Sequence, residues 1–323
     1  MGNLVYAGSQ WGILVVFTKL GHPEMVGQFT LGLAVTAPVF MLTNLQLRQI
    51  QATDAKQLYQ FSDYLGLRLL FSQLAVVAVV AISLLSDYRW ETLGVVVVLG
   101  LAKGLESISD VCYGFFQKYE RMDRIAMSLM MRGPLALLLL GLGVCLSGSA
   151  IGGVLGMLLG WGKVLIGHDL TYAMRLHKSE RLSGSMLSVD LGQVKPNWNI
   201  VKLWPLVRLA LPLGLVMMLS SLSSNLPNYF MISSLGERDL GIFNAIAYLM
   251  VAGNIIVGAL GDSASPRLAK YYASGDRGAY SLLLFRLVGI GFVLGATAVA
   301  IAVLGGGTLL SLLYSPDYAE RKT

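Results

Sequence analysis

Residues 92–115 read TLGVVVVLGLAKGLESISDVCYGF, a stretch long and apolar enough to cross a membrane as one helix. A membrane-spanning helix needs ~20 mostly apolar residues to cross a hydrocarbon layer of ~30 Å. Stretches of the same character lie on both sides of it, at 3–20, 25–46, 64–85, 130–147, 150–172, 207–234, 239–260 and 281–304. The sequence therefore predicts an all-α integral membrane protein that crosses the bilayer repeatedly.

Lysine and arginine residues concentrate in every second connection between these stretches. Because loops rich in lysine and arginine stay in the cytoplasm, these connections and the N-terminus are predicted to be cytoplasmic. We interpret the arginines that begin a stretch, Arg68, Arg132, Arg208 and Arg286, as anchors at that membrane surface. The full set on the predicted cytoplasmic side is Arg48, Lys56, Arg68, Lys118, Arg121, Arg124, Arg132, Arg175, Lys178, Arg181, Lys195, Lys202, Arg208, Arg267, Lys270, Arg277 and Arg286.

The composition excludes a soluble domain. Hydrophobic residues make up 55% of the chain and charged residues 13%, and the mean hydropathy is +0.67, whereas soluble domains carry about 25% charged residues. The net charge of +6 does not indicate nucleic-acid binding, because the basic residues adjoin membrane spans. No signal peptide is predicted, since the first basic residue, Lys19, follows the first apolar run.

The second half of the chain repeats the first. Leu20-Gly21 and the following Gly27-x-Phe29 correspond to Leu235-Gly236 and Gly241-x-Phe243. Six spans separate the two copies, an even number, so both copies face the same way across the membrane and predict a parallel repeat of two six-helix bundles. We expect an N-terminal lobe at 1–177, a cytoplasmic linker at 178–201 and a C-terminal lobe at 202–323 that is truncated after its third span and ends in an interfacial tail.

Ionisable residues inside two stretches are the candidate functional residues, because a charge at membrane depth costs ~2.5–3.5 kcal/mol. Lys103, Glu106 and Asp110 share one helix face. They either form a neutralised cluster that packs helices, or line a wet cavity in which Lys103 attracts an anion and Glu106 or Asp110 handles a coupling cation. Lys163, deep in its stretch, is a second candidate cation for the cavity. Arg48, at the end of 25–46, could receive a phosphate at the cytoplasmic mouth.

Two prolines are candidate hinges. Pro38 lies within 25–46, and Pro227 is expected to interrupt 207–234, because proline frees a backbone carbonyl and kinks a helix. Either proline could instead be a static kink. Gly152, Gly156 and Gly160 recur every fourth residue and predict close helix packing.

Several chemistries are excluded by spacing. Gly162-Lys163 lacks the rest of a phosphate-binding loop, so ATP hydrolysis is not predicted. The histidines and cysteines lack metal-ligand spacing, and His168 and Asp169 are interpreted as residues at headgroup level. We expect no cofactor, no metal and no enzymatic activity.

The chain resembles the O-antigen flippases, the oligosaccharide flippase family of the multidrug/oligosaccharidyl-lipid/polysaccharide exporter superfamily. The resemblance covers essentially the whole chain and rests on GNLVYA at 2–7, Gly27-x-Phe29-x-Leu-Gly-Leu-Ala, NLQLRQIQATD at 44–54, YERMD at 119–123, NLPNYF at 225–230, LGIF at 240–243 and SASPRLAKYY at 263–272.

This resemblance implies outward flipping of an undecaprenyl-pyrophosphate-linked oligosaccharide across the bacterial inner membrane by alternating access, with polysaccharide polymerase machinery as a possible partner. The alternatives are a cation-coupled drug or organic-cation exporter of the same architecture, which would want an acidic cavity, and a membrane O-antigen polymerase or ligase, which would want a large outer loop.

Overall fold

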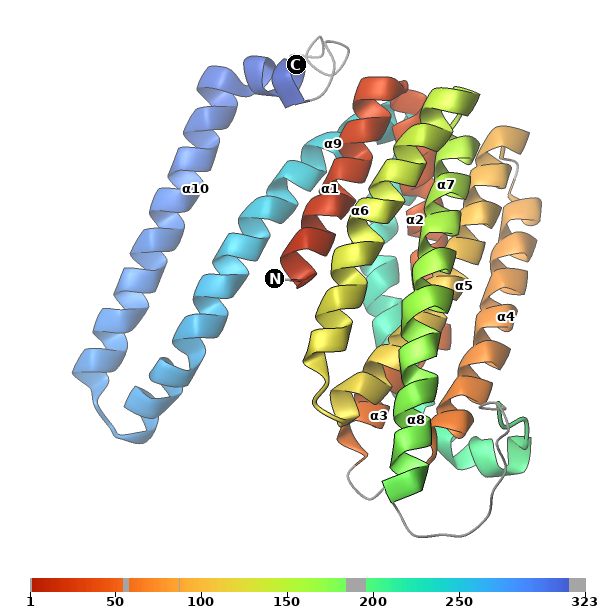
Figure 1. Cartoon of the computed structure of the whole chain (residues 1–323). Coiled ribbons are helices and arrows are strands. Elements are labelled where there is room, and N and C mark those ends of the chain that lie inside the picture. The colour runs from red at the N-terminus through yellow and green to blue at the C-terminus, as the bar shows by residue number, and fades with distance from the viewer. Residues whose placement is uncertain (1, 55–57, 87, 184–195, 314–323) are drawn as a thin grey trace. The chain divides into compact units, whose positions relative to one another are not determined.

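The computed structural model describes residues 2–54, 58–86, 88–183 and 196–313, and the described part is helical with no strand (Figure 1). Every predicted apolar stretch overlaps a helix, which confirms the all-helical class. The helices are α1 (Gly2–Leu20), α2 (Pro23–Asn44), α3 (Leu47–Thr53), α4 (Phe61–Leu85), α5 (Trp90–Lys118), α6 (Met122–Ser147), α7 (Ala150–Val164), the π-helix η1 (Leu165–Leu170), α8 (Thr171–Ser183), α9 (Ile200–Ala273) and α10 (Arg277–Leu313).

The helices are long and apolar enough for a multi-pass membrane protein. By length and composition, six segments of the described chain could each cross a bilayer, among them α4, α6 and α10. Many of their leucine and valine side chains are exposed, such as Leu74, Val77 and Leu138. In a bilayer these side chains would face acyl chains, which accounts for an apolar exterior.

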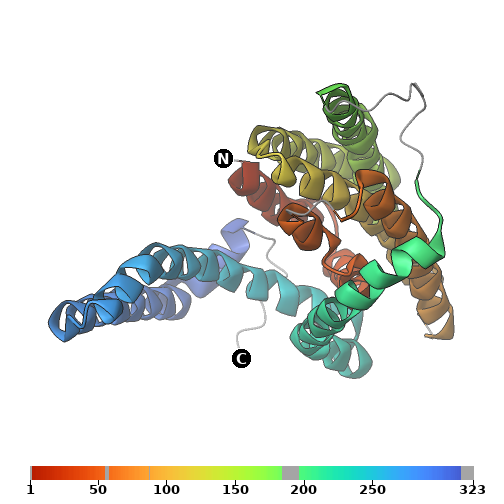
Figure 2. The same cartoon turned by 90° about the horizontal axis from the view of Figure 1, so that it is seen from below.

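Glycines allow a close contact between α6 and α7, which run side by side (Figures 1 and 2). A Cβ atom on Gly156 would overlap the backbone carbonyl of Leu139, and one on Gly152 would approach Gly143 on the same partner helix. The predicted glycine stripe therefore lets the two backbones touch.

Pro38 lies within α2 without ending the helix. Its missing N–H leaves the carbonyl of Ala34 without its helical donor. The hydroxyl of Tyr229, on α9, donates a hydrogen bond to that carbonyl at 2.6 Å. A polar group on a neighbouring helix thus replaces the lost bond, as prolines within membrane helices require.

The expected interruption at Pro227 is wrong. Helical geometry continues through Pro227, and the break in α9 falls at Gly236, which has φ 85° and ψ −176°. Only glycine adopts this conformation readily. Two residues before Pro227, the side chain of Asn225 donates a hydrogen bond to the carbonyl of Ser221 at 2.8 Å.

By contacts the chain divides into two compact units, Met1–Gly241 and Ile242–Thr323. The first unit holds the helices α1 to α8 and the part of α9 up to Gly241. The division falls later than the linker expected at 178–201, half of which (184–195) lies outside the described residues. The assignment of lobes 1–177 and 202–323 therefore stays a prediction. The second unit is built from the rest of α9 and from α10, and α10 presents exposed apolar side chains.

Candidate functional site

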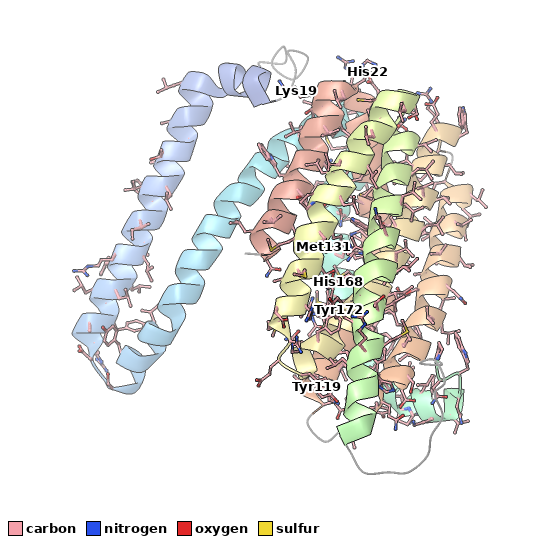
Figure 3. All side chains as sticks on the ribbon, viewed as in Figure 1. Lys19, His22, Tyr119, Met131, His168 and Tyr172 are labelled. Carbon is pink, nitrogen blue, oxygen red and sulfur yellow. The ribbon has the colours of Figure 1, made fainter. Side chains whose placement is uncertain are left out.

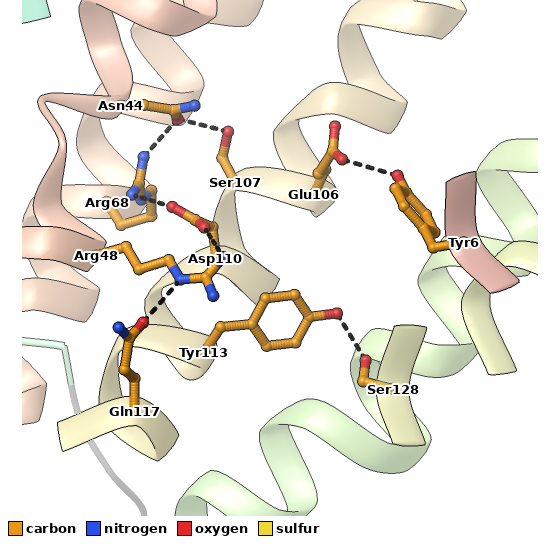
Figure 4. Close-up of polar contacts among 10 residues, drawn as sticks. All are labelled: Tyr6, Asn44, Arg48, Arg68, Glu106, Ser107, Asp110, Tyr113, Gln117 and Ser128. Carbon is orange, nitrogen blue, oxygen red and sulfur yellow. Dashed lines mark hydrogen bonds and ion pairs between the residues drawn. The ribbon is translucent and has the colours of Figure 1, made fainter. Parts of the chain in front are cut away.

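Asp110 of α5 is the centre of a charged cluster inside the first unit (Figure 4). Its two carboxylate oxygens pair with different arginines: Oδ1 lies 3.4 Å from Arg48 and Oδ2 lies 3.2 Å from Arg68. The cluster therefore holds two guanidinium groups against one carboxylate. Arg48 also donates to Gln117 at 3.4 Å and lies over the ring of Tyr113, 5.5 Å from its centroid.

A left-handed turn delivers Arg48 to this cluster. Leu45 and Gln46, between α2 and α3, both have positive φ, at 52° and 50°. Two consecutive non-glycine residues in this region are uncommon and costly. The turn ends α2 and starts the short helix α3, which packs on α5 and brings Arg48 beside Asp110.

Arg68 is fully buried, with 0% of its side chain exposed. It also donates to the amide oxygen of Asn44, which accepts a second hydrogen bond from Ser107 at 2.8 Å. The interpretation of Arg68 as a surface anchor is therefore wrong. The signal that sequence reasoning missed is its position two turns inside α4, where an unpaired arginine would be costly.

Glu106, one turn before Asp110, forms a separate group. It pairs with Lys103 at 2.7 Å and accepts a hydrogen bond from the hydroxyl of Tyr6 on α1 at 3.1 Å. The ammonium of Lys103 also lies 5.6 Å from the ring centroid of Trp161 on α7. The face predicted for α5 is thus shared between two sets of partners, one around Glu106 and one around Asp110.

Arg132 is a second buried arginine, and its interpretation as a surface anchor is also wrong. It is 1% exposed and its guanidinium lies 4.7 Å from the ring centroid of Trp161. Its Nε and one terminal nitrogen have no hydrogen-bond acceptor among the described residues. Glu106 and Asp169 are the carboxylates that act on it electrostatically.

The buried pair His168–Asp169 lies at the wide turn formed by η1, and His168 is labelled beside Tyr172 in Figure 3. The imidazole Nδ1 lies 3.0 Å from the carboxylate of Asp169, and both residues are buried. Both side chains therefore pack inside the bundle, and their interpretation as residues at headgroup level stays a prediction. π turns of this kind are frequent at functional sites.

Lys163 and the two prolines lie apart from these clusters. Lys163, on α7, is exposed and has no ion-pair partner among the described residues. Pro38 and Pro227 lie within continuous helical segments. In the described part of the chain, no group of three or more His, Cys, Asp or Glu side chains could hold a metal ion.

A further set of contacts joins the kink of α9 to the first helices. Glu237, next to Gly236, accepts hydrogen bonds from Thr92 on α5 and from Gln28 on α2, the latter at 3.1 Å. Arg238 pairs with Glu24 at 3.3 Å. We call these two contacts, Glu237 with Gln28 and Arg238 with Glu24, the kink clasp. The glycine at position 27 permits it, because a Cβ there would overlap the carbonyl of Glu237.

Comparison with known proteins agrees with the helical membrane fold described above. No family model matches the sequence. The chain is 26% identical over 321 residues to the capsular polysaccharide biosynthesis protein CapF of Staphylococcus aureus, covering 99% of this chain and 76% of CapF.

Solved structures share the fold. An inward-facing multidrug resistance MATE family transporter of the MOP superfamily superposes with a TM-score of 0.61 at 17% identity, over 97% of this chain and 73% of the transporter. A MOP superfamily transporter from Pyrococcus furiosus, characterised by a reversed polarity of its binding pocket, gives a TM-score of 0.56 at 16% identity, over 97% and 71% of the two chains. This protein is a multi-pass helical membrane protein with the fold of MOP superfamily transporters.

Proposed function

We propose that this chain is an exporter that moves a lipid-linked oligosaccharide across a membrane by alternating access. The observation that carries the proposal is the cluster of Arg48, Asp110 and Arg68, in which two cations share one carboxylate within a transporter fold. Charges at membrane depth are costly and are typical of substrate and ion pathways. A cluster with surplus positive charge favours an anionic cargo.

The two arginines differ in accessibility, which assigns them different roles. The side chain of Arg48 is 32% exposed, whereas that of Arg68 is fully buried. An incoming phosphate can therefore reach Arg48 and replace Asp110 as its partner. Arg68 meanwhile keeps the carboxylate of Asp110 neutralised, so the exchange leaves no buried charge unpaired. Arginine suits this exchange because its planar guanidinium binds phosphate through two parallel hydrogen bonds.

The coupling ion would act through the carboxylates of α5. Glu106 is held by Lys103 and Tyr6, so a proton or metal cation that binds Glu106 releases Lys103. The released ammonium then becomes available to an anion, and binding of cation and cargo is linked. In the same way, a cation that binds Asp110 would release Arg48 and make its guanidinium available to the anion. In this proposal Lys163 is an additional cation on the route, and Pro38 and Pro227 are hinges about which α2 and α9 would bend during transport, apart from the static break at Gly236.

The proposed cargo class is supported by the relative that matches almost the whole chain. CapF is a capsular polysaccharide biosynthesis protein, and the membrane carrier of a growing polysaccharide is a lipid pyrophosphate. We therefore propose undecaprenyl-pyrophosphate-linked oligosaccharide as substrate, the bacterial inner membrane as location, a cytoplasmic N-terminus, and polysaccharide polymerase machinery as partner. An inside-negative potential of 100 mV would contribute ~2.3 kcal/mol for each negative charge expelled.

The test is translocation of a fluorescent lipid-linked saccharide in proteoliposomes. Wild-type protein is expected to move the label between leaflets, and R48Q to slow the movement at least tenfold. The matched control is R208Q, because Arg208 is also an exposed arginine beside an aromatic ring, at 6.0 Å from Trp204, but lies outside the cluster. If wild-type protein moves no label with or without ion gradients, the proposal fails.

A second candidate is export of drugs or organic cations, which the fold of the MATE family transporter favours. A cationic cargo would be repelled by Arg48 once Asp110 is occupied by Arg68. Efflux of a fluorescent organic cation that R48Q accelerates, together with no movement of the lipid-linked saccharide, would establish this alternative.

A further inference from the structure

A small basic pocket lies where α5 ends, α6 begins and α8 passes. Its volume is about 240 Å³, and its lining is Phe116, Arg121, Arg124, Tyr172, Arg175 and Leu176. Pockets that bury drug-sized ligands measure ~300–1,000 Å³. This volume therefore suits a head group rather than an oligosaccharide. Half of the lining residues are arginines, and the others are apolar or aromatic.

Two of these arginines lie over the same aromatic ring, that of Tyr172. The guanidinium carbon of Arg124 lies 4.1 Å from the ring centroid of Tyr172, and that of Arg175 lies 5.5 Å from the same centroid. Both distances are within the ~6 Å at which a cation interacts with a ring. Two like charges therefore lie beside one ring, and an anion bound in the pocket would offset their repulsion.

The nearby carboxylate does not neutralise the pocket. Asp123 accepts two hydrogen bonds from Arg121, each of 3.1 Å, and lies 3.2 Å from Arg124. Arg175 pairs with no carboxylate among the described residues. Two of the three guanidinium groups therefore share one carboxylate, and Arg175 carries the surplus positive charge.

The apolar lining and the membrane setting define the ligand. Phe116 and Leu176 provide an apolar wall beside the arginines, and both residues lie at the end of the bundle that the basic connections predict to be cytoplasmic. We propose that this pocket binds the phosphate group of a lipid, with the phosphate against the arginines and the first apolar atoms of the lipid against Phe116 and Leu176. The phosphate could belong to a phospholipid or to the pyrophosphate of a polyprenyl carrier, since the chemistry that recognises them is shared.

Native mass spectrometry of the detergent-solubilised full chain tests this binding without any transport step. The probes are phosphatidylglycerol and a polyprenyl pyrophosphate, each offered alone, and inorganic pyrophosphate as a competitor. Wild-type protein is expected to retain at least one of the two lipids, and R175Q to bind it roughly fivefold more weakly, the effect of about one surface charge on an anionic lipid. R124Q/R175Q is expected to lose most of the bound lipid.

R208Q is again the matched control, because it removes an exposed, ring-associated arginine outside the pocket. Stronger retention of the polyprenyl pyrophosphate would identify the carrier as the ligand, and equal or stronger retention of phosphatidylglycerol would identify a phospholipid. The proposal is overturned if neither lipid is retained, or if R124Q/R175Q and R208Q lose lipid equally. R175E, a change at an exposed position, provides a second reading should R124Q/R175Q fold poorly: unchanged binding would also overturn the proposal. Because no translocation is measured, this result is independent of the exporter function.

Discussion

The hydroxyl of Tyr229 on α9 donates a hydrogen bond to the backbone carbonyl of Ala34 on α2, at 2.6 Å. That carbonyl is free because Pro38, four residues on, has no N–H to offer it. Two features separated by almost two hundred residues therefore form one structural unit. Pro38 leaves a backbone carbonyl without a donor inside an apolar helix, and the hydroxyl of Tyr229 donates a hydrogen bond to that carbonyl.

Y229F is expected to destabilise the protein by about 1 kcal/mol, the typical effect of one hydrogen bond between membrane helices. In a P38A background the same change should cost much less, because the alanine N–H restores the helical bond to Ala34. Unfolding in mixed detergent micelles, followed by circular dichroism, measures both. An equal effect of Y229F in the two backgrounds would show that the freed carbonyl is not what the hydroxyl serves.

D110N is expected to cost far more stability than R48Q. Without the carboxylate, the fully buried Arg68 loses its ion-pair partner, and breaking a buried pair costs about 3–5 kcal/mol. R48Q removes a partly exposed group and leaves Arg68 paired, so we expect a loss of less than about 1 kcal/mol. The same unfolding assay compares them.

An apolar double replacement checks the cause. R68M/D110L removes both buried charges together and should recover most of the stability lost in D110N. If the double variant is as unstable as D110N, the loss arises from packing around α5 and not from an unpaired charge.

G156A is expected to destabilise the protein by about 1–3 kcal/mol, because the new methyl group would push α7 away from Leu139 on α6. G8A is the matched control, since a Cβ at Gly8 meets no atom within 4 Å and alanine favours a helix by up to ~1 kcal/mol. Thermal unfolding of the two variants measures this effect. If the melting temperatures of G156A and G8A changed equally, the tight-packing account would be contradicted.

Cross-linking the kink clasp is expected to stop transport. In the alternating-access proposal the contact between Glu24 and Arg238, at 3.3 Å, must open for cargo to leave. A bis-maleimide linking E24C to R238C in a C145S background, which removes the exposed native cysteine, should abolish translocation in proteoliposomes.

The control for cross-linking is a pair that does not join different helices. R89C/E91C replaces the ion pair of 3.8 Å between Arg89 and Glu91 at the start of α5. The same reagent on this pair should leave translocation near the wild-type rate. Full transport by the cross-linked E24C/R238C protein would show that these contacts stay closed throughout the cycle.

The sequence predicted the helices well because apolar length is a strong local signal. It also predicted that Lys103, Glu106 and Asp110 share a face of α5, since helical spacing alone decides that. The residues that pair with this face could not be predicted, because Tyr6 and Asn44 lie on other helices and only tertiary packing brings them to α5. Arg68 and Arg132 were misread as surface anchors, because basic residues near a span end are common there.

Two backbone features also escaped prediction. Pro227 was expected to interrupt its helix, but the break falls at Gly236, whose conformation a proline rule does not address. The buried His168 and Asp169 lie in a π turn, and no residue pattern in the sequence indicates that turn.

The π turn at Leu165–Leu170 also bears on how this sequence aligns with those of its homologues. Such a turn is an α-helix that has gained one residue, and the hydroxyl of Thr171 bonds to the carbonyl of Ile166 at 2.9 Å, five positions back. A homologue with a regular helix here would lack that residue. We therefore expect the alignment of distant homologues with this chain to show a gap of one position at the π turn. Because the π turn takes up the extra residue locally, α8 can keep the orientation that a shorter regular helix would give it, whereas the same insertion in a regular α-helix would rotate α8 by about 100°.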